Sequence, residues 1–153
     1  MRGNHDTHDH ALIAKLGAIA CAIPIAHVVE IMRPLPVEAI GHAPAFVRGL
    51  AVIRGAPTPV VDTARLLGVA GEVTRRYVVV RAGARTVALA FDDVVDVRPI
   101  ARAELAALPP LVRGATAEAA AALAVSDAGL LVLLEAARAI PPELWRSLER
   151  GAR

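Results

Sequence analysis

Short apolar runs, broken by Gly, Pro or charged residues at strand-like intervals, make up most of this chain. Runs of roughly four to eight apolar residues are typical of β-strands, because helices need longer periodic segments. The first half is predicted to hold one helical turn at 63–67 and strands at 11–16, 18–25, 28–32, 49–53 and 58–61. The second half is predicted to hold strands at 76–81, 86–91, 94–98, 111–115 and 130–134. The predicted fold class is therefore all-β.

Three segments depart from this strand pattern. Residues 1–10 are polar and unpatterned, which predicts a flexible tail. The alanine-rich run at 117–123 combines high helix propensity with a place in the chain that favours strand and loop, and we interpret it as a mobile insertion. Residues 141–153 begin with two prolines and continue with apolar residues at helical spacing, which predicts a C-terminal helix.

Three blocks of the first half reappear in the second half in the same order. Residues 25–31 match 91–97, residues 46–49 match 111–114, and residues 60–67 match 133–140, so the offsets are 66, 65 and 73 residues. Near-constant offsets over successive blocks indicate two copies of one small fold. Closing five short strands into a barrel removes exposed strand edges. We therefore predict two small barrels, from residues 11–67 and 73–140.

Composition narrows the function classes. The 153 residues are 56% hydrophobic, and the net charge of +2 is too small to indicate nucleic-acid binding by field strength. Two Phe, one Tyr and one Trp are too few for a base-stacking platform. A single cysteine, Cys21, excludes an internal disulfide and fits a reducing cytosol. No apolar run reaches the roughly 18 residues of a membrane span, so direct membrane insertion is not expected.

Candidate catalytic and metal-binding residues are sparse. The serines stand in no nucleophile motif, and no phosphate loop or dinucleotide fingerprint is present, so no catalytic residue and no cofactor are predicted. Histidines at 5, 8 and 10 have spacings that could chelate a metal weakly, but a plain tail is favoured and no metal site is predicted. Asp92, Asp93 and Asp96 could hold a divalent ion, although we favour a solvated, turn-forming cluster.

Glu30 and Arg54 are charges at the ends of otherwise apolar strand segments. Charges in such runs usually need a partner, and a guanidinium can grip a carboxylate at two points. We predict that the two pair, with two independent surface charges as the alternative. The second copy has an acid, Asp96, at the position of Glu30 but alanine in the region that corresponds to Arg54. A pair in one copy alone indicates a one-sided binding surface.

Four motifs follow one another in the first half: CAIPIAHVVEI at 21–31, APAFVRG at 43–49, VIRG at 52–55 and PVVD at 59–62. Their order and spacing closely resemble the CheW-like domain family of chemotaxis coupling proteins, over residues 11–140. The resemblance implies two SH3-like five-stranded barrels packed side by side, with short helical turns, and no enzymatic activity. It also implies a cytoplasmic adaptor that links the cytoplasmic tip of a chemoreceptor to the regulatory domain of a CheA-type histidine kinase.

The resemblance further assigns residues to the two partners. Val28, Glu30 and Arg54 are expected to face the receptor. The kinase-facing residues are expected to be Pro44, Phe46, Val47 and Gly49. An adaptor of a pilus-motility or other chemosensory-like array is the alternative within the same fold. A small-barrel nucleic-acid-binding protein is the alternative from another class.

Overall fold

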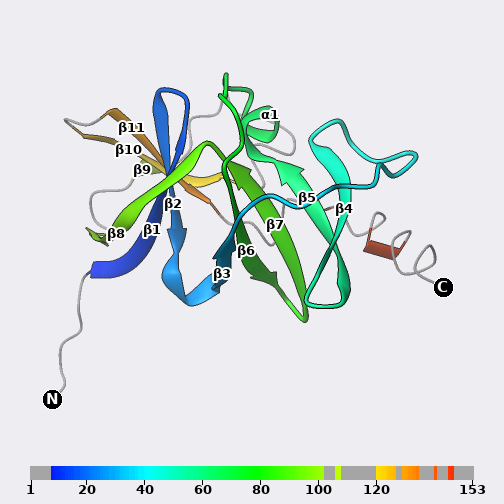
Figure 1. Ribbon diagram of the computed structural model, residues 1–153. Helices are drawn as coiled ribbons and strands as arrows, with labels where there is room; N and C mark the ends of the chain where they lie inside the picture. The colour runs from blue at the N-terminus through cyan, green and yellow to red at the C-terminus, as the bar shows by residue number, and fades with distance from the viewer. Residues whose placement is uncertain are drawn as a thin grey trace, which may run out of the picture.

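Two β-sheets lie side by side in the computed structural model (Figure 1). It describes the backbone of residues 8–101, 106–107, 120–126, 129–134, 140 and 145–146, and the side chains of residues 10–99, 140, 145 and 146. The six-stranded sheet has the spatial order β8 (Asp93–Ala101), β1 (His8–Leu16), β2 (Ile19–Pro24), β11 (Gly129–Leu134), β10 (Ala120–Ser126) and β9 (Ala106–Ala107). The five-stranded sheet has the order β3 (Val28–Met32), β6 (Arg76–Ala82), β7 (Arg85–Phe91), β5 (Ala56–Asp62) and β4 (Val47–Ile53). A 3-10 turn, η1 (Ile25–His27), precedes β3, and a short helix, α1 (Thr63–Leu67), follows β5.

The two sheets share one strand order, as the sequence repeat predicts. Strands β8, β1, β2, β11 and β10 correspond in place to β3, β6, β7, β5 and β4. In each sheet the second and third of these strands form an antiparallel hairpin, and the third and fourth run parallel. The duplication therefore extends to the direction of each of these strands.

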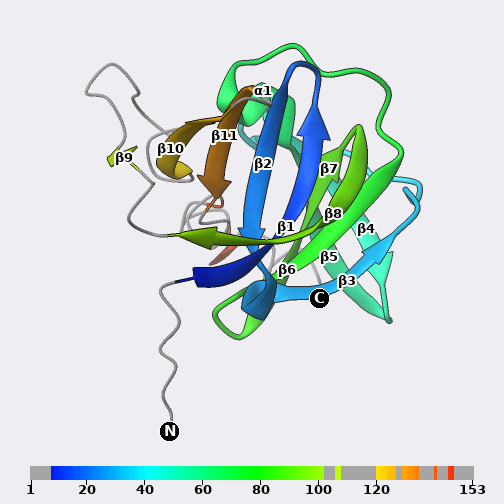
Figure 2. The ribbon, with the colours of Figure 1, turned by 90° about the vertical axis from the view of Figure 1, so that its left-hand side faces the viewer.

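The strands are nevertheless divided between the sheets differently from the predicted 11–67 and 73–140 units. Hairpin β1–β2 of the first copy joins β8, β10 and β11 of the second, and hairpin β6–β7 of the second joins β3, β4 and β5 of the first. Figure 2 shows this exchange with the six-stranded sheet toward the viewer and β6 and β7 behind it. Two of the three repeat blocks fall on corresponding strands, β3 with β8 and β5 with β11, whereas 111–114 lies outside the described residues. The blocks carry no information on which copy supplies each hairpin.

Neither sheet closes into a barrel through the strand pairs of the described residues, which corrects the predicted closed barrels. The five-stranded sheet ends at β3 and β4, and the six-stranded sheet ends at β8 and β9. The edges are handled by other means. At the edge strands β3 and β8, the pairings with β6 and β1 contain register shifts, which bend and twist a strand. At the edge strand β4, Glu38 forms a β-bridge with Leu50. Pro57 and Pro59 lie where β5 pairs with β4 alone, as expected for residues that cannot donate to a second ladder.

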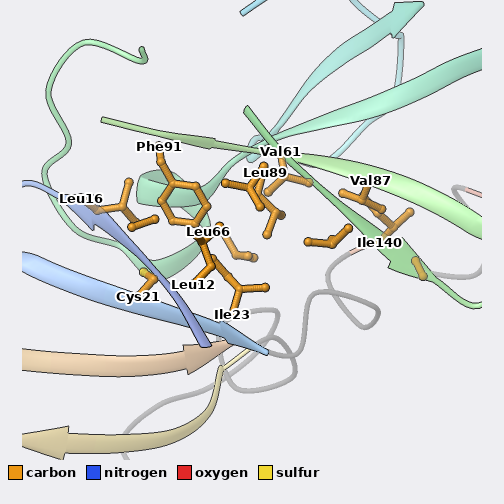
Figure 3. Packing of buried hydrophobic residues seen from close by; sticks show 14 of the residues in the cluster. Leu12, Leu16, Cys21, Ile23, Val61, Leu66, Val87, Leu89, Phe91 and Ile140 are labelled. Atoms are coloured by element: carbon orange, nitrogen blue, oxygen red, sulfur yellow. The ribbon is translucent and has the colours of Figure 1, made fainter. Parts of the chain in front are cut away.

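The main hydrophobic core lies between the sheets (Figure 3). Leu12, Leu16 and Ile23 of the six-stranded sheet pack in one cluster with Leu89 and Phe91 of the five-stranded sheet, and each is at most 2% exposed. A second cluster on β6 and β7 includes Tyr77, Val79, Ala88 and Ala90. Because β6 and β7 are buried on both faces, they read in the sequence as near-continuous apolar runs.

Three predicted segment boundaries change. Strand β1 starts at His8, so the predicted tail contributes its last three residues to a ladder with β8. The alanine-rich 117–123 segment contains the start of β10, because pairing with β11 and β9 overrides the helix propensity of alanine. Residues 145 and 146 are helical, whereas 111–115 and the rest of the predicted C-terminal helix lie outside the described residues.

Candidate interaction site

Glu30 on β3 and Arg54, which directly follows β4, form an ion pair with two hydrogen bonds. Arg54 Nε donates to Glu30 Oε2 and Arg54 Nη2 donates to Glu30 Oε1, each over 3.0 Å. A guanidinium presents two parallel donors to a carboxylate, which a lysine ammonium cannot do. The predicted pairing is confirmed. The Glu30 side chain is 21% exposed and that of Arg54 is 80% exposed, so the cation lies outermost.

The backbone holds Arg54 in an unusual conformation. Arg54 and Gly55 form the two-residue turn between β4 and β5, and their φ angles are 54° and 78°. Positive φ at both central residues is the signature of a type I′ turn, whose twist matches the flanking strands. A non-glycine residue in this region costs roughly 1 to 2 kcal/mol. The turn thereby directs the guanidinium back toward β3.

The ion pair also changes the protonation of its carboxylate. The hydrogen bond from Arg54 holds the pKa of Glu30 below its usual value, with desolvation opposing the shift and the charge of Arg54 adding to it. The same contacts raise the pKa of Arg54. Both groups are therefore charged at neutral pH, and the pair presents a fixed dipole at the surface.

A largely apolar groove of about 550 Å³ opens beside this pair. Arg85 lies over the ring of Trp145, with its guanidinium carbon 4.8 Å from the ring centroid, which is a cation–π geometry. Sequence reasoning missed both residues, since nothing local links a turn residue to a tryptophan 60 positions later. The groove is lined by Val29, Glu30, Ile53, Arg54, Ala56, Pro57, Val79, Ala84, Arg85, Thr86 and Trp145.

Val28, the third residue predicted to face the receptor, is turned partly toward the core. Burial alternates along β3, so Val28 and Glu30 are half-buried while Val29 and Ile31 are each 43% exposed. Val28 packs against the main core cluster. The outward apolar side chains of this edge strand are thus Val29 and Ile31, of which Val29 lines the groove.

The residues predicted to face the kinase surround the start of β4. The Val47 amide donates to the Pro44 carbonyl over 2.9 Å, Val47 is buried, and Phe46 packs half-buried against the core. Gly49 has a φ of 147° and lies so close to the Glu38 carbonyl that a Cβ would clash with it. Val47 and Gly49 therefore shape the backbone of this segment, and side-chain surface comes from Pro44 and Phe46.

A polar cavity of about 390 Å³ lies next to this segment. Arg48 contacts Asp62 over 3.3 Å and donates through Nη2 to Thr74 Oγ1 over 2.9 Å. Asp62 also caps α1 by accepting from the Arg65 amide over 3.1 Å, as its position before the helical turn predicts. These contacts tie β4, β5 and the 68–75 linker together.

Asp92 has a structural role that corrects the predicted solvated cluster. Its side chain accepts from the Gly17 amide over 2.6 Å and from the Glu72 amide over 2.9 Å, and the residue is only 7% exposed. It joins the β1–β2 turn to the linker. Its neighbours differ: Asp93 accepts from the amide of Val94, and Asp96 forms an exposed pair with Arg98 over 3.0 Å.

Within the described part of the chain, no three His, Cys, Asp or Glu side chains are grouped so as to hold a metal ion. The same residues contain no helix that is long and apolar enough to cross a membrane. Cys21 is buried, and this burial raises the pKa of its thiol to about 12.

Comparisons with known proteins agree with this fold. The chain is 29% identical over 132 residues to "Chemotaxis protein CheW" of Rhizobium meliloti, covering 84% of this chain and 85% of the relative. It is 29% identical over 131 residues to "Probable chemotaxis protein CheW" of Rhizobium etli, covering 83% and 84%. The crystal structure of the scaffolding protein TtCheW from Thermoanaerobacter tengcongensis superposes with a TM-score of 0.75 at 21% identity, covering 88% of this chain and 89% of that one. The family model for the CheW-like domain matches residues 10–141, so this chain belongs to the CheW-like domain family.

Proposed function

We propose that this chain is a non-enzymatic chemotaxis scaffold that couples the cytoplasmic tip of a chemoreceptor to a CheA-type histidine kinase in the cytoplasm. Family membership and the names of the two rhizobial relatives support a place in chemotaxis. The observation that carries the proposal is the two-point Glu30–Arg54 pair at the rim of an apolar groove. An apolar patch with a charged rim is the usual composition of a protein-binding surface.

The receptor is proposed to dock where the groove meets the edge strand β3. Val29 is 43% exposed and supplies apolar surface to the groove. Glu30 and Arg54 supply fixed charges at the border of this surface. Such charges determine the orientation of a bound partner more than they increase its affinity. Val28 supports this surface from beneath by packing on the core.

The kinase is proposed to dock on the segment that starts β4. Pro44 and Phe46 offer partly exposed apolar side chains there, and Val47 and Gly49 hold the backbone in place. Substituting Gly49 by alanine would therefore disturb kinase binding through the backbone, because its Cβ would meet the Glu38 carbonyl.

Charge reversal tests the receptor part of the proposal. Glu30→Arg and Arg54→Glu are each expected to impair receptor binding, and the double exchange to recover part of it. The exposed Asp96–Arg98 pair is the matched control, since it has the same 3.0 Å contact on β8 but no groove residue. Reversal of either control residue should leave binding unchanged. Equal binding by all Glu30 and Arg54 variants would refute a role for the pair.

Pull-down of the wild-type chain with a CheA-type kinase from the same genome tests the kinase part. Failure to bind any such kinase would overturn the coupling function. An adaptor for a pilus-motility array is the second candidate within this family, and the chromosomal neighbours of the gene distinguish the two. The alternative of a small-barrel nucleic-acid-binding protein gains no support from the described residues, because the groove that they form is largely apolar.

A further inference from the structure

The β1–β2 hairpin is joined to the rest of the described chain by the turn η1 alone. None of the three residues of this turn is buried, and Ile25 is 41% exposed. Two hydrogen bonds hold the turn within the described residues. The Val28 amide donates to the Ile25 carbonyl, and Arg81 Nη1 donates to the Ala26 carbonyl over 3.2 Å. Straightening η1 therefore breaks few contacts of the turn itself.

The hairpin makes its contacts with segments that follow η1 in the chain. Strand β1 pairs with β8, and β2 pairs in parallel with β11. Leu12 and Ile23 of the hairpin pack in one cluster with Leu89. The Gly17 amide, in the turn of the hairpin, donates to Asp92 over 2.6 Å. A second copy of the chain offers all of these partners in the same geometry, so a hairpin from that copy forms the same strand pairs and the same core.

The two repeats already complete each other's sheets in this way. Hairpin β6–β7 occupies in the five-stranded sheet the place that β1–β2 occupies in the six-stranded sheet (Figure 2). Each hairpin belongs to one repeat, and the strands on either side of it belong to the other. Each sheet is therefore built to receive a hairpin from outside its own repeat.

The length and stiffness of η1 decide whether the hairpin stays with its own chain. The turn has three residues, and Pro24 directly precedes it with a φ of −52° that its ring fixes. A short and stiff hinge has few conformations that return the hairpin to its own sheet, and such hinges invite exchange between copies. Because both forms have the same contacts outside η1, the exchanged form is favoured as the protein concentration rises.

We propose that the β1–β2 hairpin is an exchange element, and that its second acceptor is another copy of this chain. In the exchanged dimer, each hairpin lies between β8 and β11 of the other copy. Strands β3 to β7, which form the sheet beside the Glu30–Arg54 pair, stay within one chain. The dimer therefore presents two intact ion pairs and is a bivalent form of the protein. This inference does not depend on the proposed receptor and kinase partners.

Two cysteine variants detect the exchange directly. Lys15 is exposed on β1, and its partner across the ladder is Asp93 on β8. Opposite Cα atoms of an antiparallel pair lie about 4.5 to 5.5 Å apart, which a disulfide can span. Full-length Lys15→Cys and Asp93→Cys chains are unfolded together, refolded under reducing conditions at high protein concentration and then oxidised. An exchanged dimer brings the two cysteines of different chains opposite each other, so we expect a covalent heterodimer.

The matched control is a mixture of Lys15→Cys with Val52→Cys. Val52 is 68% exposed, and it lies on β4 of the other sheet. This mixture should give no more covalent dimer than each variant gives alone.

Two hinge variants test the role of η1. Deleting Ala26 shortens the turn, and we expect the mass measured by light scattering to double. Inserting Gly-Ser-Gly after Ala26 relaxes the hinge and should return the chain to the mass of the monomer.

A covalent heterodimer of Lys15→Cys with Asp93→Cys in clear excess over the Val52→Cys control supports the exchange. A yield equal to the control overturns it, because an unexchanged dimer does not bring position 15 of one chain to position 93 of the other. An equal yield with the inserted hinge overturns it, since η1 would then not control the exchange. Exchange only after deletion of Ala26 overturns it for the natural chain. The natural hinge carries the decisive measurement, so the test stands if the deletion variant does not fold.

Discussion

The two hydrogen bonds of Asp92 predict a large stability loss on truncation. Asp92→Ala removes a carboxylate that accepts from Gly17 over 2.6 Å and from Glu72 over 2.9 Å, at a residue only 7% exposed. A hydrogen bond to a charged group contributes about 1.5 to 3 kcal/mol, and removing the acceptor leaves two donors without a partner. Because both bonds share one carboxylate, their effects do not add fully, and we expect a loss of about 3 to 5 kcal/mol.

A loss of this size is a large part of the roughly 5 to 15 kcal/mol that folds a domain. It should lower the midpoint of thermal unfolding by about 10 °C, since each kcal/mol shifts a domain of this size by about 2 to 4 °C. Asp92→Asn keeps one acceptor oxygen and turns an NH₂ group toward the other donor. We expect it to fall between the wild type and the alanine variant.

Urea unfolding followed by circular dichroism measures the effect. Asp93→Ala is the matched control, because the adjacent Asp93 accepts only from the amide of Val94, its neighbour in sequence. Its loss should stay below about 1 kcal/mol. If Asp92→Ala and Asp93→Ala unfold at the same urea concentration, the two long-range hydrogen bonds do not stabilise the fold and the reasoning fails.

Three further predictions concern the ion pair, the cysteine and the hairpin exchange. Arg54 lowers the pKa of Glu30, so the pair stabilises the folded protein at pH values above the ordinary titration range of a glutamate, and this stabilisation is lost as the pH falls through the lower pKa of the folded state. In Arg54→Ala, carboxyl NMR should show that the pKa of Glu30 returns to its ordinary range. An unchanged titration would contradict the pairing. Burial raises the pKa of the Cys21 thiol to about 12, so at pH 8 it should react with a thiol reagent on the order of a thousand times more slowly in the folded protein than after denaturation. Equal rates would show that Cys21 is accessible to the reagent in the folded protein. Fragments 1–73 and 74–153 should each lack native structure alone and regain it on mixing, as judged by circular dichroism; a first fragment that folds alone would contradict the exchange.

The local parts of this fold follow from the sequence, and the long-range parts do not. The apolar runs predicted most strands within a few residues, and Glu30 and Arg54 could be paired because each is a charge in an apolar run. The alanine run before Ser126 was misread, since its ladder partners decide its conformation more than its own propensity does.

The site residues that sequence reasoning missed depend on contacts between distant segments. In the sequence, Asp92 cannot be distinguished from the nearby Asp93 and Asp96. In the structure it differs because amides of the β1–β2 turn and of the linker donate hydrogen bonds to its side chain. Arg85 and Trp145 stand 60 positions apart in the sequence, and no local pattern indicates that they meet. An aspartate directly after a long buried strand is the one signal that could have marked Asp92.

The exchange of hairpins sets an order in which the chain can complete its sheets on the ribosome. Hairpin β1–β2 is synthesised first, yet its neighbour β8 begins at Asp93, after the 68 residues that follow Pro24. At roughly 5 to 20 residues per second, the nascent hairpin waits about 3 to 14 seconds for that partner. The five-stranded sheet is complete once Phe91 has been made, so it can offer Leu89 and Phe91 as an apolar surface on which the waiting hairpin is sheltered. Synonymous codons that slow translation between β2 and β8 would then lengthen the exposure of the hairpin without changing the protein.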